Sequence, residues 1–216
     1  MQYHRSTSSV SQHALSFSLA AIIAVIGVIG IPLFGHASIL INGSFESGFT
    51  GWTTTGINNV LLRTTANFPA TEGQNMINFN GGETVPNGTL SQSVPTLTGQ
   101  SYTIAFDFGN WGNYLPVTQG LRVKLQGNAL LDQRDVIDST ISSSQNPALV
   151  YNPFSYTFVA DSVLTTLTFT DIASSTTSSD GLLDNVRITA VPEPSALVLG
   201  GFGLLILFRA RRANAR

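Results

Sequence analysis

The side chains of this 216-residue chain that could carry chemistry are carboxylates and aromatic rings. The chain contains no Cys, and its three His residues, His4, His13 and His36, all precede residue 38. Residues 38–190 therefore cannot hold a Ser-His-Asp triad, a Cys-His pair or a zinc site with His or Cys ligands. Carboxylate catalysis, binding of a hard cation and binding through aromatic rings remain.

Paired carboxylates could hydrolyse a glycosidic bond, because Asp and Glu alone can supply the acid and the nucleophile. The candidates Glu46, Glu72, Glu83 and Asp107 show no characteristic spacing, so we expect them to be solvated loop charges. A secreted glycosidase or other hydrolase of surface polysaccharide stays as the alternative to a binding or structural function.

A second use of carboxylates is cation binding. Asp184 shares the alternation of the apolar residues in 182–188, which predicts that it points toward the buried side of a strand. A buried carboxylate needs a partner. Glu46 could meet it if the first and last strands lie close together, and two such carboxylates would suit Ca²⁺, which prefers oxygen ligands. Alternatively, Asp184 caps backbone amides or pairs with Arg187.

The segment NWGNY at residues 110–114 is a candidate ligand-binding loop. It is expected to follow a strand that ends at Phe108, and it combines the rings of Trp111 and Tyr114 with the amides of Asn110 and Asn113. Aromatic faces cover the C–H groups of a sugar while amides bond its hydroxyl groups. The alternative is that Trp111 folds back over the core.

The charge of the chain restricts its partners. The chain has 10 Lys and Arg against 12 Asp and Glu, but residues 38–190 contain five basic and eleven acidic residues, a net charge of −6. An acidic surface disfavours anionic partners, so nucleic acid is excluded. Asp132, Asp135 and Asp138 lack the spacing of a calcium loop and are expected to be solvated.

Period-two alternation of apolar and polar residues predicts that residues 38–190 form one all-β domain. Clusters of Gly, Asn and Pro separate the alternating segments, as is typical of turns. No segment of the domain has a helical period, and short strands separated by turns predict an antiparallel sandwich. The expected strands are 38–41, 60–64, 76–79, 90–94, 102–108, 121–125, 154–158, 167–169 and 185–190.

Residues 1–37 have the pattern of a secretory signal peptide with one apolar helix. Arg5 precedes an uncharged stretch over residues 14–37, which contains the run AAIIAVIGVIGI and ends with Gly-His-Ala. A basic start, an apolar run and a small-x-small exit predict cleavage after Ala37. The alternative is an uncleaved anchor helix.

Residues 191–216 form a second targeting segment. Pro192, Glu193 and Pro194 precede fourteen mostly apolar residues, 195–208, and a terminal arginine cluster. A helix of this length spans about 21 Å, against the ~30 Å of a hydrocarbon core. Arginine near a span favours the cytoplasmic side, so the acidic domain is expected outside the inner membrane. The cluster consists of Arg209, Arg211, Arg212 and Arg216.

These three parts in this order resemble the PEP-CTERM sorting signal of Gram-negative bacteria. The resemblance implies that a membrane-bound, exosortase-like enzyme processes the chain near Pro192-Glu193-Pro194. It also implies a transient inner-membrane tether with a periplasmic domain, followed by delivery to the cell surface or the exopolysaccharide matrix of a biofilm. The alternative is a plain membrane anchor that nothing cuts.

The domain opens with NGSFE at residues 42–46 and Gly51-Trp52, and it closes with GLLDNV at residues 181–186. It thereby resembles the jelly-roll superfamily of carbohydrate-binding modules and galactose-binding-like domains. The resemblance implies a jelly-roll sandwich, a structural Ca²⁺ held by Glu46 and Asp184, and a non-enzymatic binding or structural function with exopolysaccharide as a ligand. Trp52 is expected in the core.

Overall fold

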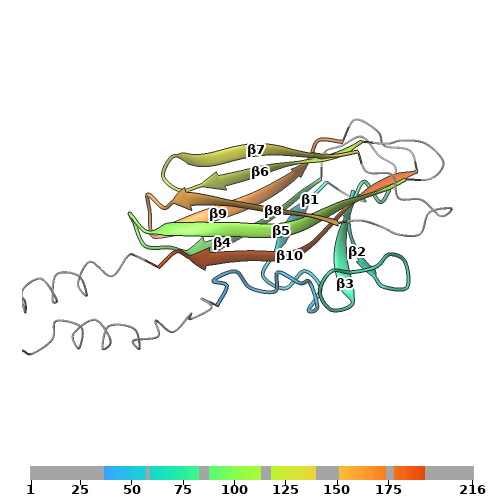
Figure 1. Ribbon diagram of the computed structural model, residues 1–216, viewed down its shortest axis with the longest axis horizontal. Coiled ribbons are helices and arrows are strands. Elements are labelled where there is room, and N and C mark those ends of the chain that lie inside the picture. The colour runs from blue at the N-terminus through green and yellow to red at the C-terminus, as the bar shows by residue number, and fades with distance from the viewer. Residues whose placement is uncertain are drawn as a thin grey trace, which may run out of the picture. The chain divides into compact units, whose positions relative to one another are not determined.

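The computed structural model describes residues 37–56, 59–82, 88–112, 118–139, 151–173 and 178–192, which contain strands and no helix. The strands make two antiparallel five-stranded sheets (Figure 1). The first sheet has the order β1-β4-β9-β6-β7 and the second the order β2-β3-β10-β5-β8. The strands are β1 (Thr53–Thr55), β2 (Val60–Thr64), β3 (Asn75–Phe79), β4 (Thr89–Pro95), β5 (Ser101–Gly112), β6 (Gln119–Gln126), β7 (Leu130–Asp138), β8 (Tyr151–Val159), β9 (Leu164–Asp171) and β10 (Ser179–Ala190). The prediction of an all-β antiparallel sandwich is confirmed.

The core lies between the two sheets and is rich in aromatic rings. Phe106 of β5 and Phe169 of β9 meet edge to face across the interface, with ring centroids 5.2 Å apart. Trp52 is only 7% exposed and packs between Phe45 and Phe169, which confirms its expected place in the core. Alternating side chains of the strands other than β1 thus form one apolar layer.

The N-terminal segment of the domain is not the strand that was expected at residues 38–41. It is irregular, although Ile39 N donates to Ile188 O at 2.8 Å and Val186 N donates to Gly43 O at 3.0 Å. This segment lies along β10 beyond the point where β3 stops pairing with it, because β3 pairs only as far as Leu183. A Cβ atom at Gly43 would collide with the carbonyl oxygen of Val186, so this close approach requires glycine.

The sequence also did not predict β1 or β7. The expectation that Asp138 is solvated is wrong, since Asp138 is 3% exposed. It lies on β7 two residues after Val136, so both side chains point inward. Asp132 and Asp135 form ion pairs with arginines at the surface.

A β-bulge in β10 changes which side chains face the core. The pairing with β5 skips between Asp184 and Arg187, and Asn185 adopts a left-handed φ of 54°. Leu183 and Val186 therefore both lie in the core, whereas Asp184 lies on the outer face of the second sheet. The prediction that Asp184 is buried is confirmed, but its expected shared face with Val186 is wrong.

None of the described residues belongs to a helix that is long and apolar enough to span a membrane. The predicted signal helix, Glu193, Pro194, residues 195–208 and the arginine cluster lie outside the described residues. The last described residue, Pro192, is exposed.

Candidate functional site

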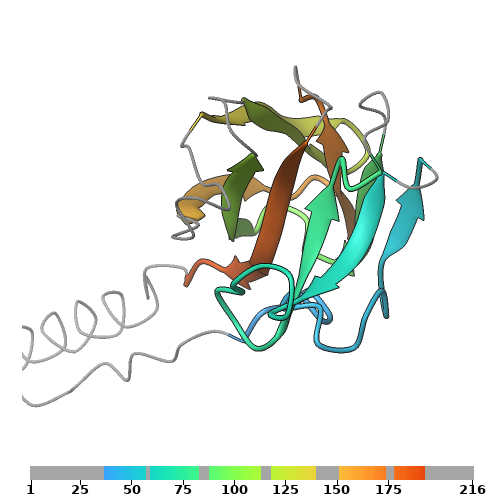
Figure 2. The same ribbon diagram turned by 90° about the vertical axis from the view of Figure 1, so that its right-hand side faces the viewer.

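The loop of residues 65–74 between β2 and β3, here called the strap, crosses the outer face of the second sheet (Figure 2). The Tyr151 hydroxyl on β8, at the far edge of the sheet, donates to Pro69 O at 2.9 Å. On this outer face Met76, Asn78 and Leu182 have no exposed surface. This part of the face is therefore covered, and the hydrogen bond from Tyr151 to Pro69 shows that the strap reaches across the sheet to β8.

An open cleft of about 500 Å³ lies where the strap meets β5. The rings of Phe68 and Trp111 form one wall, with centroids 5.5 Å apart and planes at 65°. Both rings are partly exposed. Among the described residues, the lining contains aromatic, amide and hydroxyl groups and no charged side chain. These residues are Thr65, Asn67, Phe68, Pro69, Ala70 and Trp111.

The expectation that residues 110–114 form a loop is wrong for residues 110–112, which belong to β5. β5 continues to Gly112, and Trp111 pairs in register with Asp180 of β10. Alternation along β5 puts Trp111 on the outer face and Asn110 on the inner one, where Asn110 has no exposed surface and donates to Asp138 O at 3.3 Å. Asn113 and Tyr114 lie outside the described residues.

The cleft thus joins Trp111 to Phe68, which the sequence reasoning did not single out. The signal that could have found Phe68 is a large ring between Asn67 and Pro69 in a polar turn. A ring in such a turn has no strand to carry it into the core, so it needs another partner.

Asp184 holds the middle of the strap from below. Its Oδ2 accepts hydrogen bonds from Thr71 N at 2.7 Å, Thr71 Oγ1 at 3.1 Å and Glu72 N at 2.9 Å. Its Oδ1 accepts Asn185 N at 2.6 Å. The side chain has no exposed surface, and this burial outweighs the four hydrogen bonds and raises the pKa of Asp184 above its ordinary value.

Glu46 holds the end of the strap. Its Oε1 accepts Gln74 N at 2.8 Å and Asn75 N at 2.7 Å. Gly73, with a left-handed φ of 67°, turns the chain around this carboxylate, and a Cβ atom there would collide with it. The two predicted partners, Glu46 and Asp184, therefore meet the same loop, each through different backbone amides.

Negative charge accumulates beneath the strap. Asp107 lies directly opposite Asp184 in the register of β5 and β10 and accepts Asn185 Nδ2 at 3.0 Å. Like charges in such positions repel each other. Burial and the nearby carboxylates of Asp184 and Asp107 raise the pKa of Tyr151.

No lysine or arginine forms an ion pair with Glu46, Asp107 or Asp184 in the part of the chain that the structure describes. Arg187 instead donates to Asn185. The described residues bring no three acidic side chains together as a metal site, and both Asp184 and Glu46 already accept backbone amides of the strap. Ca²⁺ held by Glu46 and Asp184 would have to complete its shell with carbonyl oxygens or water.

Comparisons with known proteins address the fold. No protein-family model and no curated protein matches the sequence. Among solved structures, TmCBM61 in complex with beta-1,4-galactotriose aligns with a TM-score of 0.54 at 17% identity, over 71% of this chain and 99% of that one. The K1 cleaved adhesin domain of Lys-gingipain from Porphyromonas gingivalis W83 aligns with a TM-score of 0.52 at 14% identity, over 69% of this chain and 96% of that one.

Both alignments extend over nearly the whole of the compared domain. At these identities the likeness concerns the path of the backbone, and ligands do not follow from it. The described domain therefore has the jelly-roll sandwich fold of a carbohydrate-binding module.

Proposed function

We propose that the domain is a non-catalytic carbohydrate-binding module of an exported bacterial surface or matrix protein, and that the cleft of Phe68 and Trp111 is its saccharide site. The observation that supports this proposal is an open, uncharged cleft of about 500 Å³ walled by two rings whose centroids are 5.5 Å apart. This volume lies within the roughly 300–1,000 Å³ of small-ligand sites.

The lining of the cleft suits a neutral sugar. The faces and edges of Phe68 and Trp111 can cover C–H groups, while Asn67 and Thr65 can bond hydroxyl groups. No cationic side chain lines the cleft in the part of the chain that the structure describes, and the net charge of residues 38–190 is −6. An anionic polysaccharide would meet repulsion there, so we favour a neutral exopolysaccharide.

Binding accounts for the cleft better than hydrolysis does. A glycosidase of this type needs two carboxyl groups on either side of the scissile bond, about 5–10 Å apart. The described residues that line the cleft include no Asp or Glu. Glu46 and Asp184 accept backbone amides of the strap, and Glu83 lies outside the described residues.

Binding of neutral oligosaccharides to purified variants tests the proposal. We expect Trp111→Ala and Phe68→Ala to weaken binding at least about tenfold, because each removes a ring that covers the sugar. Trp111→Phe, which keeps a ring, should retain part of the affinity. Ile137→Ala is the control, since Ile137 is exposed on β7, a strand of the first sheet. Equal binding by the wild type and Trp111→Ala would exclude the cleft, and a wild type that binds no glycan would refute the module.

The same proposal includes the route by which the domain leaves the cell. The signal peptide directs export, residues 195–208 with the arginine cluster hold a transient inner-membrane tether, and an exosortase-like enzyme acts near Pro192-Glu193-Pro194. The exposure of Pro192 supports it, because a processing enzyme needs accessible, extended chain.

Intact mass of the exported product tests this route. We expect Pro192→Ala combined with Pro194→Ala to leave the tail attached, since the two prolines keep Glu193 out of a helix. Ser195→Ala is the control, because it leaves both prolines in place. An unchanged mature mass in the double proline variant would contradict processing at this motif.

A further inference from the structure

Most of the exposed apolar side chains of the domain gather at one of its ends. Three turns meet there, taken here with the strand ends that flank them: residues 95–101, 126–131 and 159–165. Thr96 N donates to Val163 O at 3.0 Å and Ala129 N donates to Asp161 Oδ2 at 2.8 Å, which ties the three turns together. Five of the eight large apolar side chains that the described residues expose lie on these turns: Leu97, Leu130, Val159, Val163 and Leu164.

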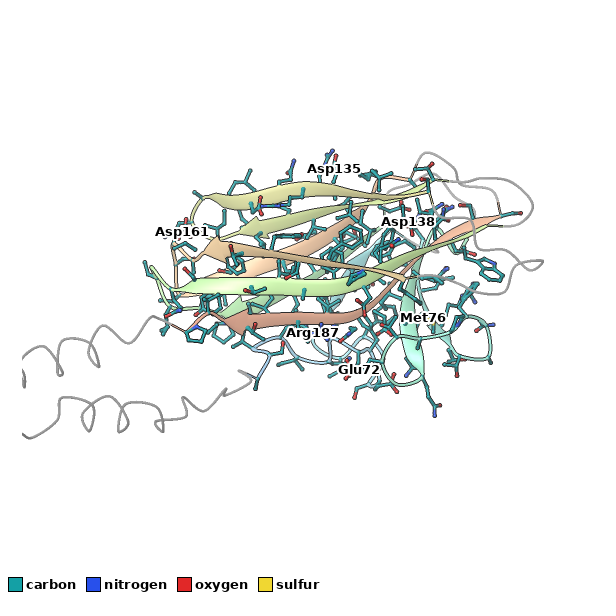
Figure 3. The ribbon with its side chains drawn as sticks, viewed as in Figure 1. Glu72, Met76, Asp135, Asp138, Asp161 and Arg187 are labelled. Carbon is teal, nitrogen blue, oxygen red and sulfur yellow. The ribbon has the colours of Figure 1, made fainter. Side chains whose placement is uncertain are left out.

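This region, here called the apolar end, is almost free of charge. Its three turns are fully described and contain one charged residue, Asp161, which Figure 3 labels. Its carboxylate accepts Asn128 N at 2.9 Å and Ala129 N at 2.8 Å, and these bonds lower the pKa of Asp161. The rest of the domain carries the remaining acidic and basic residues, so the apolar end is set apart in both charge and hydropathy.

The chain leaves the domain at the apolar end. Val191 N donates to Ser101 O at 2.9 Å, and Gln100 Nε2 donates to Val191 O at 2.7 Å. Ser195, where the apolar tail begins, lies four positions after Val191, and a fully extended chain of four residues reaches about 14 Å. A tail inserted in a bilayer would therefore hold the apolar end within this distance of its surface.

We infer that the apolar end rests on the lipid surface while the tail tethers the protein, an inference that depends on the proposed tether. The transfer of exposed apolar side chains from water into the interfacial region, about 5–10 Å into the headgroup boundary, lowers the free energy. The three turns contain no Lys or Arg, so the contact does not require anionic lipid.

This orientation would direct the cleft outward. β5 begins at the apolar end with Ser101 and carries Trp111 ten residues further on, which is about 33 Å along a strand. The lipid contact would thus keep the cleft at the far side of the domain, where a polymer outside the cell can reach it.

Site-specific fluorescence quenching tests the inference on the full chain with its tail, reconstituted in phosphatidylcholine vesicles. Because the chain has no Cys, a single introduced thiol can carry a fluorophore without background labelling. The probe position is Val163→Cys, and the matched control is Ile137→Cys, an apolar position that is also exposed, at 54%. Ile137 precedes Asp138, which Figure 3 labels far from Asp161.

We expect nitroxide-labelled lipid to quench the probe at residue 163 at least about threefold more than the probe at residue 137. Replacing phosphatidylcholine partly by phosphatidylglycerol should not increase this difference. Adding Leu97→Asp and Leu164→Asp should reduce quenching at residue 163 to the level of the control while the chain still floats with the vesicles.

Equal quenching at both positions in a chain that floats would overturn the lipid contact and leave the tether intact. A chain that does not float would overturn both. A third outcome is that, in the absence of vesicles, the probe at residue 163 becomes less exposed to water as the protein concentration rises. This would mean that two copies pair through the apolar end, and it would also overturn the inference.

Discussion

At the scale of residues, one buried carboxylate determines how the candidate site is held. Asp184 Oδ2 accepts three donors from Thr71 and Glu72, and Oδ1 accepts a fourth from Asn185. A carboxylate can do this because both of its oxygens only accept hydrogen bonds. An amide in its place would turn an N–H group toward one of these sets of donors.

Asp184→Asn is therefore expected to lower the free energy of unfolding by about 2–3 kcal/mol, because buried amides lose their acceptor. It should also weaken saccharide binding, since the strap that carries Phe68 loses its anchor. Urea unfolding and calorimetric titration measure the two effects.

Asp135→Asn is the control for this substitution. Its carboxylate is exposed and paired with Arg122, so little change in stability is expected. Asp184→Asn with wild-type stability and wild-type binding would contradict the proposed anchoring.

At the scale of elements, the strap joins parts of the chain that are far apart in sequence. It is bonded to Glu46 before the first strand, to Tyr151 on β8 and to Asp184 on β10. The bulge at Asn185 is what turns Asp184 toward the strap instead of the core. The cleft is therefore a product of loop placement on a rigid sheet, which is where binding residues are commonly found.

Calcium binding by Glu46 and Asp184 stays a prediction at this scale, and thermal unfolding tests it. We expect Ca²⁺ to raise the Tm, because a cation would neutralise carboxylates that have no ion-pair partner among the described residues. Asp184→Ala should abolish the rise, and Mg²⁺ serves as the control because it demands a tighter octahedral shell. A Tm that is insensitive to both Ca²⁺ and chelator would show that the amide bonds alone hold the strap.

At the scale of the whole molecule, the acidic sandwich has an apolar end with a single charged residue, Asp161, and a cleft far from that end. Burial raises the pKa of Asp171 as well as that of Asp184. The folded state therefore holds these protons more tightly than the unfolded chain does. Surface repulsion from the net charge of −6 over residues 38–190 acts in the same direction.

Without added divalent cations, the free energy of unfolding is accordingly expected to rise as the pH falls from 7 toward about 4.5. This range lies above the ordinary carboxyl pKa of about 3.9, so the carboxyl groups of the unfolded chain remain ionised. Below that range it should fall, because Asp161, whose pKa is lowered, loses its bonds to Asn128 and Ala129 on protonation. Urea unfolding across this pH range measures the profile. Asp171→Asn should reduce the rise in the free energy of unfolding between pH 7 and about 4.5. A wild type that is less stable at pH 5 than at pH 7 would refute the predicted profile.

Local patterns in the sequence were sufficient for the class of fold and for several exclusions. Alternation is a property of neighbouring residues, so it predicted most of the strands, but it placed Asp184 on the wrong face of the sheet. Because the chain has no Cys and its His residues all precede residue 38, the sequence alone excludes a Ser-His-Asp triad, a Cys-His pair and a His or Cys zinc site from residues 38–190. The two targeting segments stay predictions from composition and order, since residues 1–36 and 193–216 lie outside the described residues.

Only the tertiary structure decided which distant residues meet. Phe68 and Trp111 are 43 residues apart, and their contact depends on how the strap crosses the sheet. The side of the sheet on which Asp184 lies depends on a one-residue bulge, and the burial of Asp138 depends on β7, a strand that the sequence did not predict. Periodicity reports which side chains share a face, but register, bulges and loop paths are set by packing between segments that no local pattern connects.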